Sequence, residues 1–274
     1  MKLSGCLDSL FLREYPIFED RIVGCAEAGL DAVEFWLWRD KDLNRIERAL
    51  GDTGLELSLF STEPRSPIVD PATHKVFIDG LRESVGVAKR LGAPGLCVLV
   101  DDRGVGAGNE PRTDITKGQQ RKAIVDALRV GAPIAADAGV TLLVEPLNSK
   151  LDHVGYFLDH TLEGLDIIEE VDHPSVRLLY DMYHSTMMGE WPAEVLGNRA
   201  SLVGHVHVAD VPGRHEPGSG TINWVTYMTT LKDLGYGGTV GLEYWPTNST
   251  ADTLAQARTL LESAEKIPGR GLRP

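Results

Sequence analysis

Short apolar runs alternate with longer amphipathic segments along almost the whole chain. A short apolar run bounded by turn residues is typical of a buried β-strand, whereas apolar residues repeated at helical spacing indicate an amphipathic helix. On this basis we predict strands at residues 2–6, 31–36, 55–60, 95–100, 140–145, 176–181, 202–208 and 239–243. The run at 95–100 is apolar throughout, as expected for a parallel strand that is covered on both faces.

A helical segment follows each predicted strand. We expect helices at residues 17–28, 42–50, 70–91, 118–138, 162–171, 191–196, 223–234 and 251–266. Gly29, Gly51 and Gly92 directly follow three of these segments, where glycine commonly ends a helix. Eight strand–helix repeats without a shift in composition predict one (β/α)₈ TIM barrel domain over residues 1–274.

A doubly wound open sheet is the alternative fold. It needs fewer strands and usually has a glycine-rich first turn, whereas the first turn here is Leu7-Asp8-Ser9-Leu10. Another glycine-rich stretch, at residues 104–108, does not lead straight from a strand into a helix as a phosphate-binding loop does. We therefore interpret residues 104–108 as a flexible loop that covers the mouth of the barrel.

Four consecutive predicted strands have, at their last position or the one before it, a residue that commonly binds metal ions. They are Glu145, Asp181, His207 and Glu243. The active site of a TIM barrel lies at the carboxyl ends of its strands, and three carboxylates gathered there would repel one another without a cation among them. The set is rich in oxygen, so it favours Mn²⁺, Mg²⁺ or Co²⁺ over a closed structural zinc site. One such residue alone is commonly a turn or cap residue, so the prediction depends on all four together.

The stretch 202–224 adds further chemistry at the end of the seventh strand. His205 and His207 share one face of that strand, and we expect His205 to fill the barrel interior while His207 binds the metal. Arg214 lies in a loop bounded by two Pro-Gly pairs, and its planar cation is suited to binding a substrate carboxylate or hydroxyl. His215 and Glu216 either line the site or brace the loop.

Charge and composition limit the classes of partner. The chain has 40 acidic and 27 basic residues, a formal net charge of −13, and no run of lysine or arginine, so we expect no nucleic-acid partner. No apolar run is long enough to span a bilayer, and the first residues lack the apolar core of a signal peptide. Its three cysteines cannot all pair. Buried thiols in a reducing compartment fit best, and we expect a cytoplasmic protein without a membrane partner.

The strand ends and the loops that follow them resemble the hydroxypyruvate isomerase family, within the xylose-isomerase-like barrels that isomerise and epimerise sugars. The resemblance is carried by Glu145-Pro146-Leu147-Asn148, Asp152-His153, Leu179-Tyr180-Asp181-Met182-Tyr183-His184 and Val208-Ala209-Asp210-Val211-Pro212-Gly213-Arg214-His215-Glu216-Pro217-Gly218. It implies a divalent metal held by Glu145, Asp181, His207 and Glu243, with Glu145 and Glu243 also acting as the acid and base. It further implies that His184 and Arg214 hold substrate oxygens, that His153 can line the pocket, and that the chain forms a homo-oligomer.

The function implied is proton transfer between adjacent carbons of a small α-hydroxycarbonyl compound through an enediolate. Hydroxypyruvate, giving tartronate semialdehyde, or a related oxo-tetronate is the expected substrate. A ketose 3-epimerase acting on free sugars is the alternative, since His207 is the seventh-strand ligand of those epimerases, where bacterial hydroxypyruvate isomerases have glutamine. An apurinic endonuclease-like hydrolase or a non-catalytic sugar-binding barrel is less favoured, because the chain is acidic and has all four ligands.

Overall fold

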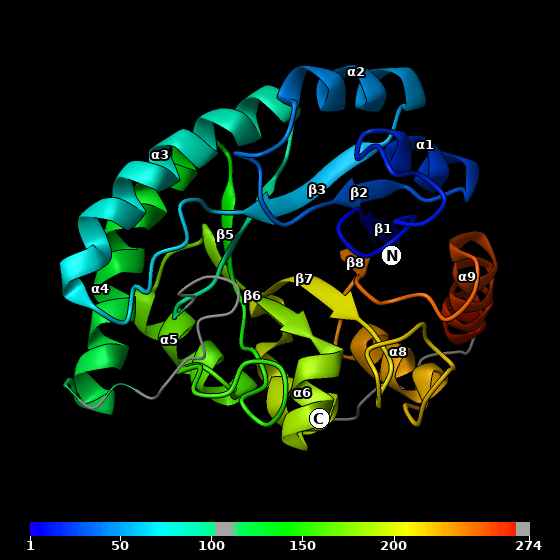
Figure 1. Cartoon of the computed structure of the whole chain (residues 1–274). Helices are drawn as coiled ribbons and strands as arrows, with labels where there is room; N and C mark the ends of the chain where they lie inside the picture. The colour runs from blue at the N-terminus through cyan, green and yellow to red at the C-terminus, as the bar shows by residue number, and fades with distance from the viewer. Residues whose placement is uncertain (102–111, 113, 267–274) are drawn as a thin grey trace.

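The computed structural model describes residues 1–101, 112 and 114–266. Eight strands form a closed barrel in chain order, and every pair of neighbours is parallel (Figure 1). The predicted TIM barrel is therefore confirmed. The strands are β1 Lys2–Cys6, β2 Ala32–Glu34, β3 Glu56–Ser61, β4 Gly95–Val98, β5 Thr141–Val144, β6 Val176–Asp181, β7 Val203–Val208 and β8 Thr239–Leu242.

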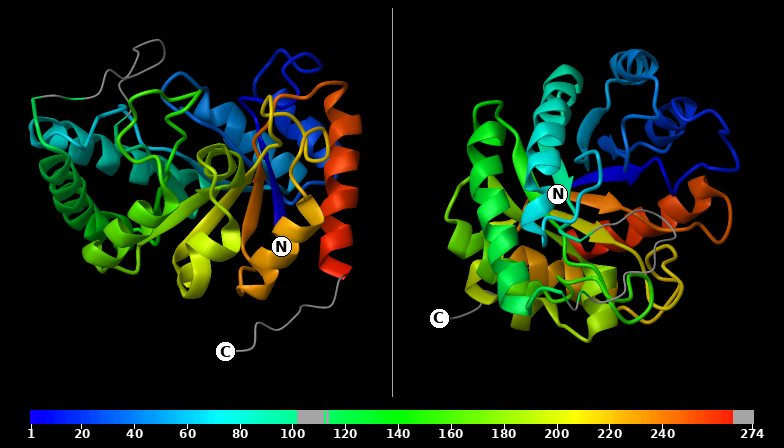
Figure 2. Two further views of the ribbon diagram at one scale, coloured as in Figure 1. Left: turned by 90° about the horizontal axis from the view of Figure 1, so that it is seen from below. Right: turned by 60° about the vertical axis from the view of Figure 1, so that its left-hand side comes forward.

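Helices surround the barrel (Figure 2). Their apolar faces and the outward faces of the strands form the main hydrophobic core. The α-helices are α1 Asp20–Glu27, α2 Leu43–Thr53, α3 His74–Leu91, α4 Lys117–Ala136, α5 Thr161–Val171, α6 Met182–Met188, α7 Pro192–Leu196, α8 Trp224–Asp233 and α9 Thr250–Lys266. Two short 3₁₀ helices, η1 Pro71–Thr73 and η2 Gly197–Leu202, precede α3 and β7. In the left-hand view of Figure 2, the loops after β1, β5 and β7 lie together at one end of the barrel.

Local chemistry explains where α2 begins and ends. Asp42 accepts hydrogen bonds from the backbone N–H groups of Asn44 and Arg45, so it caps the first turn. The prediction that Gly51 ends this helix is wrong. The helix continues to Thr53 and ends at Gly54, whose φ of 73° is the left-handed conformation that glycine adopts most easily.

The connection after β6 also differs from the prediction. We expected helix only around residues 191–196, but α6 begins directly after Asp181. The Asp181 carboxylate accepts a hydrogen bond from the backbone N–H of His184, 3.0 Å away, and so caps this helix. A helix of two turns in which no residue is exposed has no clear amphipathic period, so the periodicity could not reveal it.

The barrel interior is divided into an apolar and a polar part. Leu59, Cys97, Leu143 and Leu179 form a separate apolar cluster contributed by β3 to β6. Buried polar side chains from β1, β2, β3 and β7 include Ser4, Glu34, Ser58, His205 and His207. Side chains alternate between the two faces of a strand, so His205 and His207, two residues apart on β7, both face inward.

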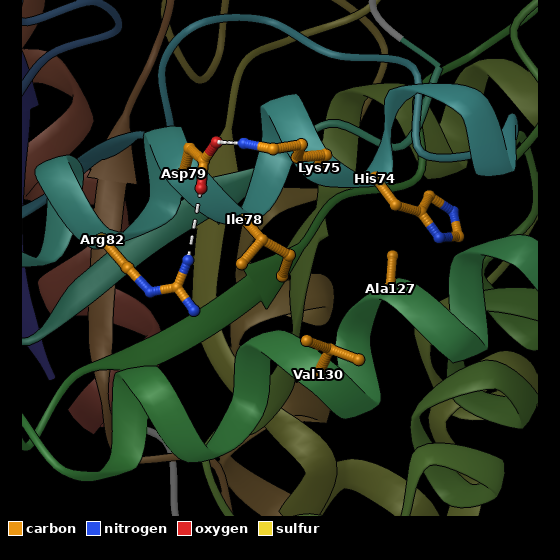
Figure 3. A pocket seen from close by; sticks show the side chains of 7 residues that line it. All are labelled: His74, Lys75, Ile78, Asp79, Arg82, Ala127 and Val130. Carbon is orange, nitrogen blue, oxygen red and sulfur yellow. Dashed lines mark hydrogen bonds and ion pairs between the residues drawn. The ribbon is translucent and has the colours of Figure 1, made fainter.

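The three cysteines are buried and unbonded to one another, as expected. Among the described residues, no helix combines the length and the apolar character required to cross a membrane. A hollow of about 360 Å³ lies on the outer surface between α3 and α4 (Figure 3). Residues of these two helices line it, and Asp79 there pairs with Lys75 and Arg82. This hollow is a feature of the helical layer and not of the strand ends.

Candidate metal and catalytic centre

The four strand-end residues lie together at the mouth of the barrel. Each offers one ligand atom, and these atoms lie within 4.8 Å of one another. His207 Nδ1 is 3.3 Å from Glu145 Oε1 and 3.5 Å from Glu243 Oε2. All four side chains are buried. Asp181 and His207 lie within β6 and β7, whereas Glu145 and Glu243 each follow the last residue of their strand.

The electrostatics of this cluster favour a bound cation. Burial raises the pKa of Glu145 and of Asp181. Burial would also raise the pKa of Glu243, but the positive charges of Arg214 and His207 outweigh it and lower that pKa. Burial opposes the charge of His207, yet Glu243 and Glu34 raise its pKa well above the ordinary value. In the metal-free chain, the positive charges of protonated His207 and of Arg214 therefore offset the negative charge of the carboxylates. A bound divalent cation can replace the proton on His207.

Both oxygens of Glu243 have close donors. Trp36 Nε1 donates to Oε1 at 2.6 Å, and the Arg214 guanidinium donates to Oε2. Trp36 thus lies against Glu243, and its ring is edge-on to that of Trp245 at 6.2 Å between centroids. Glu145 has a weaker contact, from the thiol of Cys97 at 3.4 Å.

Arg214 reaches the cluster from the loop after β7. Its guanidinium pairs with Glu243, lies 3.9 Å from Asp181 Oδ2 and stands over the ring of Tyr183. The residue has a φ of 56°, which few residues other than glycine adopt. A non-glycine residue in this conformation is retained where the surrounding contacts fix it, and such positions are common at functional sites.

Asp210 holds this loop in place. Its buried carboxylate accepts hydrogen bonds from the backbone N–H groups of Val211, Gly218 and Ile222 and from Trp224 Nε1, at 2.8 to 3.0 Å. Two of these donors meet Oδ1 and two meet Oδ2. The carboxylate therefore fixes the start, the middle and the end of the loop that carries Arg214.

We predict that Asp210→Asn lowers the free energy of unfolding by about 3 kcal/mol or more. The new amide would point an N–H group at two of the four donors, and each buried donor left without an acceptor is costly. Urea unfolding followed by circular dichroism measures the change. Asp126→Asn, on the outer surface of α4, is the matched control and should change stability by less than about 0.5 kcal/mol. Equal stability of the two variants would show that Asp210 does not anchor the loop.

His215 and Glu216 connect the loop that carries Arg214 to the loop after β8. The Nδ1 atom of His215 is 2.7 Å from the backbone oxygen of Trp245. Glu216 is buried and accepts hydrogen bonds from the backbone N–H and the hydroxyl of Thr247. Both side chains tie the loop after β7 to the loop after β8, so they brace the site.

His184 presents a single hydrogen-bond donor toward the cluster. Its Nδ1 accepts from the side-chain amide of Asn148 at 2.6 Å and from the backbone N–H of Asn148 at 3.2 Å. The amide orientation is fixed, because Asn148 Oδ1 accepts from the backbone N–H groups of Leu151 and Asp152. The hydrogen of the neutral ring must therefore be on Nε2.

Nε2 of His184 is buried and has no hydrogen-bond partner among the described residues; Asp181 Oδ2 lies 3.7 Å away. Burial and the charge of Arg214 hold the pKa of His184 well below its ordinary value, so the ring is neutral. The ring of His153 lies 5.3 Å from that of His184, centroid to centroid.

One buried acid of this region, Glu34, was not predicted. Glu34, the last residue of β2, lies inside the barrel with Oε1 3.0 Å from His207 Nε2 and Oε2 3.2 Å from His205 Nε2. His205 does fill the barrel interior, as predicted, and it does so beside Glu34. Glu34 lies inside the predicted strand 31–36, and only the shorter β2 of the structure, Ala32–Glu34, makes it a strand-end residue. The glycine-rich stretch 104–108 lies outside the described residues.

Comparison with known proteins agrees with the fold and with the sequence resemblance. The model of the xylose isomerase-like TIM barrel family matches residues 23–266. A putative hydroxypyruvate isomerase of Danio rerio is 32% identical over 88% of this chain and 89% of its own length. A 2-oxo-tetronate isomerase of Cupriavidus necator is 31% identical over 89% of this chain and 93% of its own length.

Solved structures share the architecture. The AP endonuclease, family 2, from Brucella melitensis superposes with a TM-score of 0.85 and 29% identity, covering 94% of this chain and 98% of that protein. A D-allulose 3-epimerase from Methylomonas sp. has a TM-score of 0.80 at 20% identity, covering 96% of this chain and 98% of its own, which shows a common fold. The chain therefore belongs to the xylose isomerase-like TIM barrel family, as one of its isomerases and epimerases.

Proposed function

We propose that this chain is a divalent-metal-dependent isomerase that moves a proton between adjacent carbons of a small α-hydroxycarbonyl acid. Hydroxypyruvate, which would give tartronate semialdehyde, or an oxo-tetronate is the proposed substrate. The observation that carries the proposal is the convergence of three buried carboxylates and one imidazole from four consecutive strands, beside the cation of Arg214 and the free N–H of His184. The names of the curated relatives point to the same reaction class.

The donor set fits a hard divalent cation. Glu145, Asp181, His207 and Glu243 would hold it, and their crowded, buried carboxylates explain why the cluster attracts positive charge. Mn²⁺, Mg²⁺ and Co²⁺ all suit three oxygen donors and one nitrogen donor. Such a cation supplies Lewis acidity, which stabilises negative charge on the carbonyl and hydroxyl oxygens of a bound substrate.

The proton transfer is assigned to Glu145 and Glu243. One carboxylate would take a proton from the hydroxymethyl carbon of hydroxypyruvate, and the electron pair of that C–H bond would form the enediolate. The neighbouring carbonyl carbon would then receive a proton, and the proton of the hydroxymethyl oxygen would pass to the former carbonyl oxygen, so the hydroxymethyl group becomes the aldehyde and the ketone becomes the secondary alcohol. Two carboxylates within the same cluster provide one group to remove the proton and one to return it.

Two further side chains would hold the substrate. His184 Nε2–H would donate to the oxygen that gains negative charge, and its neutral ring keeps this hydrogen available as a donor. The guanidinium of Arg214 would bind the substrate carboxylate, for which a planar fork of donors is well suited. Arg214 thus favours a keto acid over a neutral sugar.

We expect Arg214→Gln to lower kcat/KM for hydroxypyruvate about 10- to 100-fold, the range for losing a hydrogen-bonded charge pair. Dihydroxyacetone has the same hydroxymethyl ketone without a carboxylate, and any turnover of it should fall much less. Steady-state kinetics with both compounds measures the difference. An equal loss for both would show that Arg214 acts through Glu243 and not through the substrate carboxylate.

Ketose 3-epimerisation is the second candidate function. It would use the same carboxylates, with the proton returned to the opposite face of the carbon that lost it. His207, which matches the seventh-strand residue of ketose 3-epimerases, favours it. Assays of hydroxypyruvate, 2-oxo-tetronate and free ketoses under identical metal conditions separate the two. Preference for a keto acid supports the isomerase, and preference for a free ketose supports the epimerase.

Metal binding should strengthen as the pH rises. In the metal-free chain the pKa of His207 is raised well above its ordinary value, so its ring carries a proton near neutral pH, and the binding nitrogen must lose it. The raised pKa of Glu145 and of Asp181 adds protons that the cation displaces at lower pH. Calorimetric titration with Mn²⁺ at about pH 6 and about pH 8 should show tighter binding at the higher value. An affinity independent of pH would contradict the ligand assignment.

A further inference from the structure

Glu34 is the buried acid that the proposed reaction does not use. Its side chain is almost fully enclosed in the barrel, and it lies on the opposite side of His207 from the carboxylate cluster. Ser58 donates to its Oε2 at 2.9 Å, and Ser58 is itself 2.7 Å from the hydroxyl of Ser4. The orientation of this carboxylate is therefore set by neighbours on β1 and β3.

The ring of His207 lies between the carboxylate of Glu34 on one side and those of Glu145 and Glu243 on the other. Nε2 is 3.0 Å from Glu34 Oε1, whereas Nδ1 faces Glu145 and Glu243 at 3.3 and 3.5 Å. An ionised carboxylate can only accept, so the nitrogen that faces Glu34 carries a hydrogen. In the neutral ring the lone pair is then on Nδ1, which points into the cluster.

Gly241 on β8 makes room for this contact. A Cβ atom at that position would lie 2.2 Å from Glu34 Oε1 and 2.7 Å from Cδ2 of His207. Both distances are far shorter than side chains tolerate, so any larger residue would force the carboxylate and the ring apart. The approach of Glu34 to His207 is thus built into the packing of the barrel.

We propose that Glu34 is a positioning residue that fixes His207 as an Nδ1 ligand and thereby raises the affinity of the centre for a divalent cation. The inference rests on the proposed metal site. A carboxylate on the far nitrogen of a ligating imidazole fixes the ring, its tautomer and its basicity, and the loss of such partners typically weakens metal binding about 10- to 100-fold.

The alternative is that Glu34 contributes only to the packing of the barrel interior, through its contact with His205, and has no effect on metal binding. Glu34 Oε2 is 3.2 Å from His205 Nε2, so this second imidazole shares the carboxylate. His205→Gln separates the two cases, because its amide keeps a donor facing Glu34 while the imidazole is removed. Glu34→Gln removes the charge, and its single amide oxygen cannot serve both histidines.

The experiment measures Mn²⁺ binding to the chelator-treated full chain by the electron paramagnetic resonance signal of free Mn²⁺. We expect Glu34→Gln to raise the dissociation constant about 10- to 100-fold and His205→Gln to leave it within error of the wild type. Glu34→Asp, whose shorter side chain withdraws from His207, should fall between the wild type and Glu34→Gln, and it replaces Glu34→Gln if that variant does not fold.

A spectroscopic signature tests the tautomer directly. With ¹⁵N-labelled histidine and ¹¹³Cd²⁺ at the centre, the metal should couple to Nδ1 of His207 in the wild type, and the coupling should weaken or vanish in Glu34→Gln. Unchanged Mn²⁺ affinity in Glu34→Gln, equal losses in Glu34→Gln and His205→Gln, coupling to Nε2, or two Mn²⁺ ions per chain would each overturn the inference. A wild-type chain that binds no Mn²⁺ would instead overturn the proposed function together with it.

Discussion

Glu145→Gln is expected to lower kcat for hydroxypyruvate isomerisation by about 10²- to 10⁴-fold, the usual contribution of a positioned acid or base. Glutamine keeps the size of the side chain but cannot take up or return a proton. The contacts of Glu145 with the Cys97 thiol at 3.4 Å and with His207 Nδ1 at 3.3 Å are both longer than the Trp36 hydrogen bond of Glu243, so replacement of Glu145 should disturb the surrounding hydrogen bonds less. The loss should therefore fall mainly on kcat, as steady-state kinetics at saturating metal can show.

Glu243→Gln should differ in character. Both oxygens of Glu243 accept hydrogen bonds from Trp36 and Arg214, so the variant also disturbs the side chain proposed to bind the substrate carboxylate. We expect a fall in kcat together with a rise in KM. Glu190→Gln is the control, because Glu190 is half-buried and bonds Thr161 and Ser185 away from the cluster. Near-wild-type kcat in Glu145→Gln and Glu243→Gln would rule out the acid and base assignment.

Removal of divalent cations is expected to lower activity by about 10³-fold or more, since the stabilisation of a developing oxyanion by a metal is worth several kcal/mol. Dialysis against a chelator followed by addition of Mn²⁺, Mg²⁺ or Co²⁺ measures the loss and its recovery. The same treatment should leave the fold intact, because Arg214 and protonated His207 offset the carboxylates in the metal-free chain.

Asp181→Asn provides the matched variant. The amide oxygen can still accept from the backbone N–H of His184, so α6 keeps its cap, while the charged ligand is lost. Weaker Mn²⁺ binding with an unchanged melting temperature is the expected outcome. Full activity in the presence of excess chelator would remove the metal from the mechanism.

The barrel and its mouth could be predicted from sequence because the information is local. A short apolar run predicts a strand wherever it occurs, and the rule that TIM barrels work at the carboxyl ends of their strands then groups residues far apart in the chain. Glu145, Asp181, His207 and Glu243 were found in this way, and the structure brings their ligand atoms within 4.8 Å of one another.

The supporting contacts could not be predicted in the same way. Trp36 contacts Glu243 where the last strand of the barrel closes on the first ones, and Glu34 contacts His207 inside the barrel. Both contacts depend on how the strands are staggered. The tautomer of His184 depends on the amide of Asn148, whose orientation is set by a turn that periodicity does not reveal. These contacts are tertiary, and no local pattern of apolar and polar residues encodes them.

The most direct measurement of the central claim follows hydroxypyruvate by ¹H NMR in D₂O with the Mg²⁺-loaded chain. We predict formation of tartronate semialdehyde, with exchange of the migrating hydrogen for solvent deuterium. In Glu145→Gln we expect neither product formation nor exchange. The proposed function is contradicted if neither hydroxypyruvate nor 2-oxo-tetronate exchanges hydrogen or isomerises with Mg²⁺, Mn²⁺ or Co²⁺, or if wild-type exchange persists in both Glu145→Gln and Glu243→Gln.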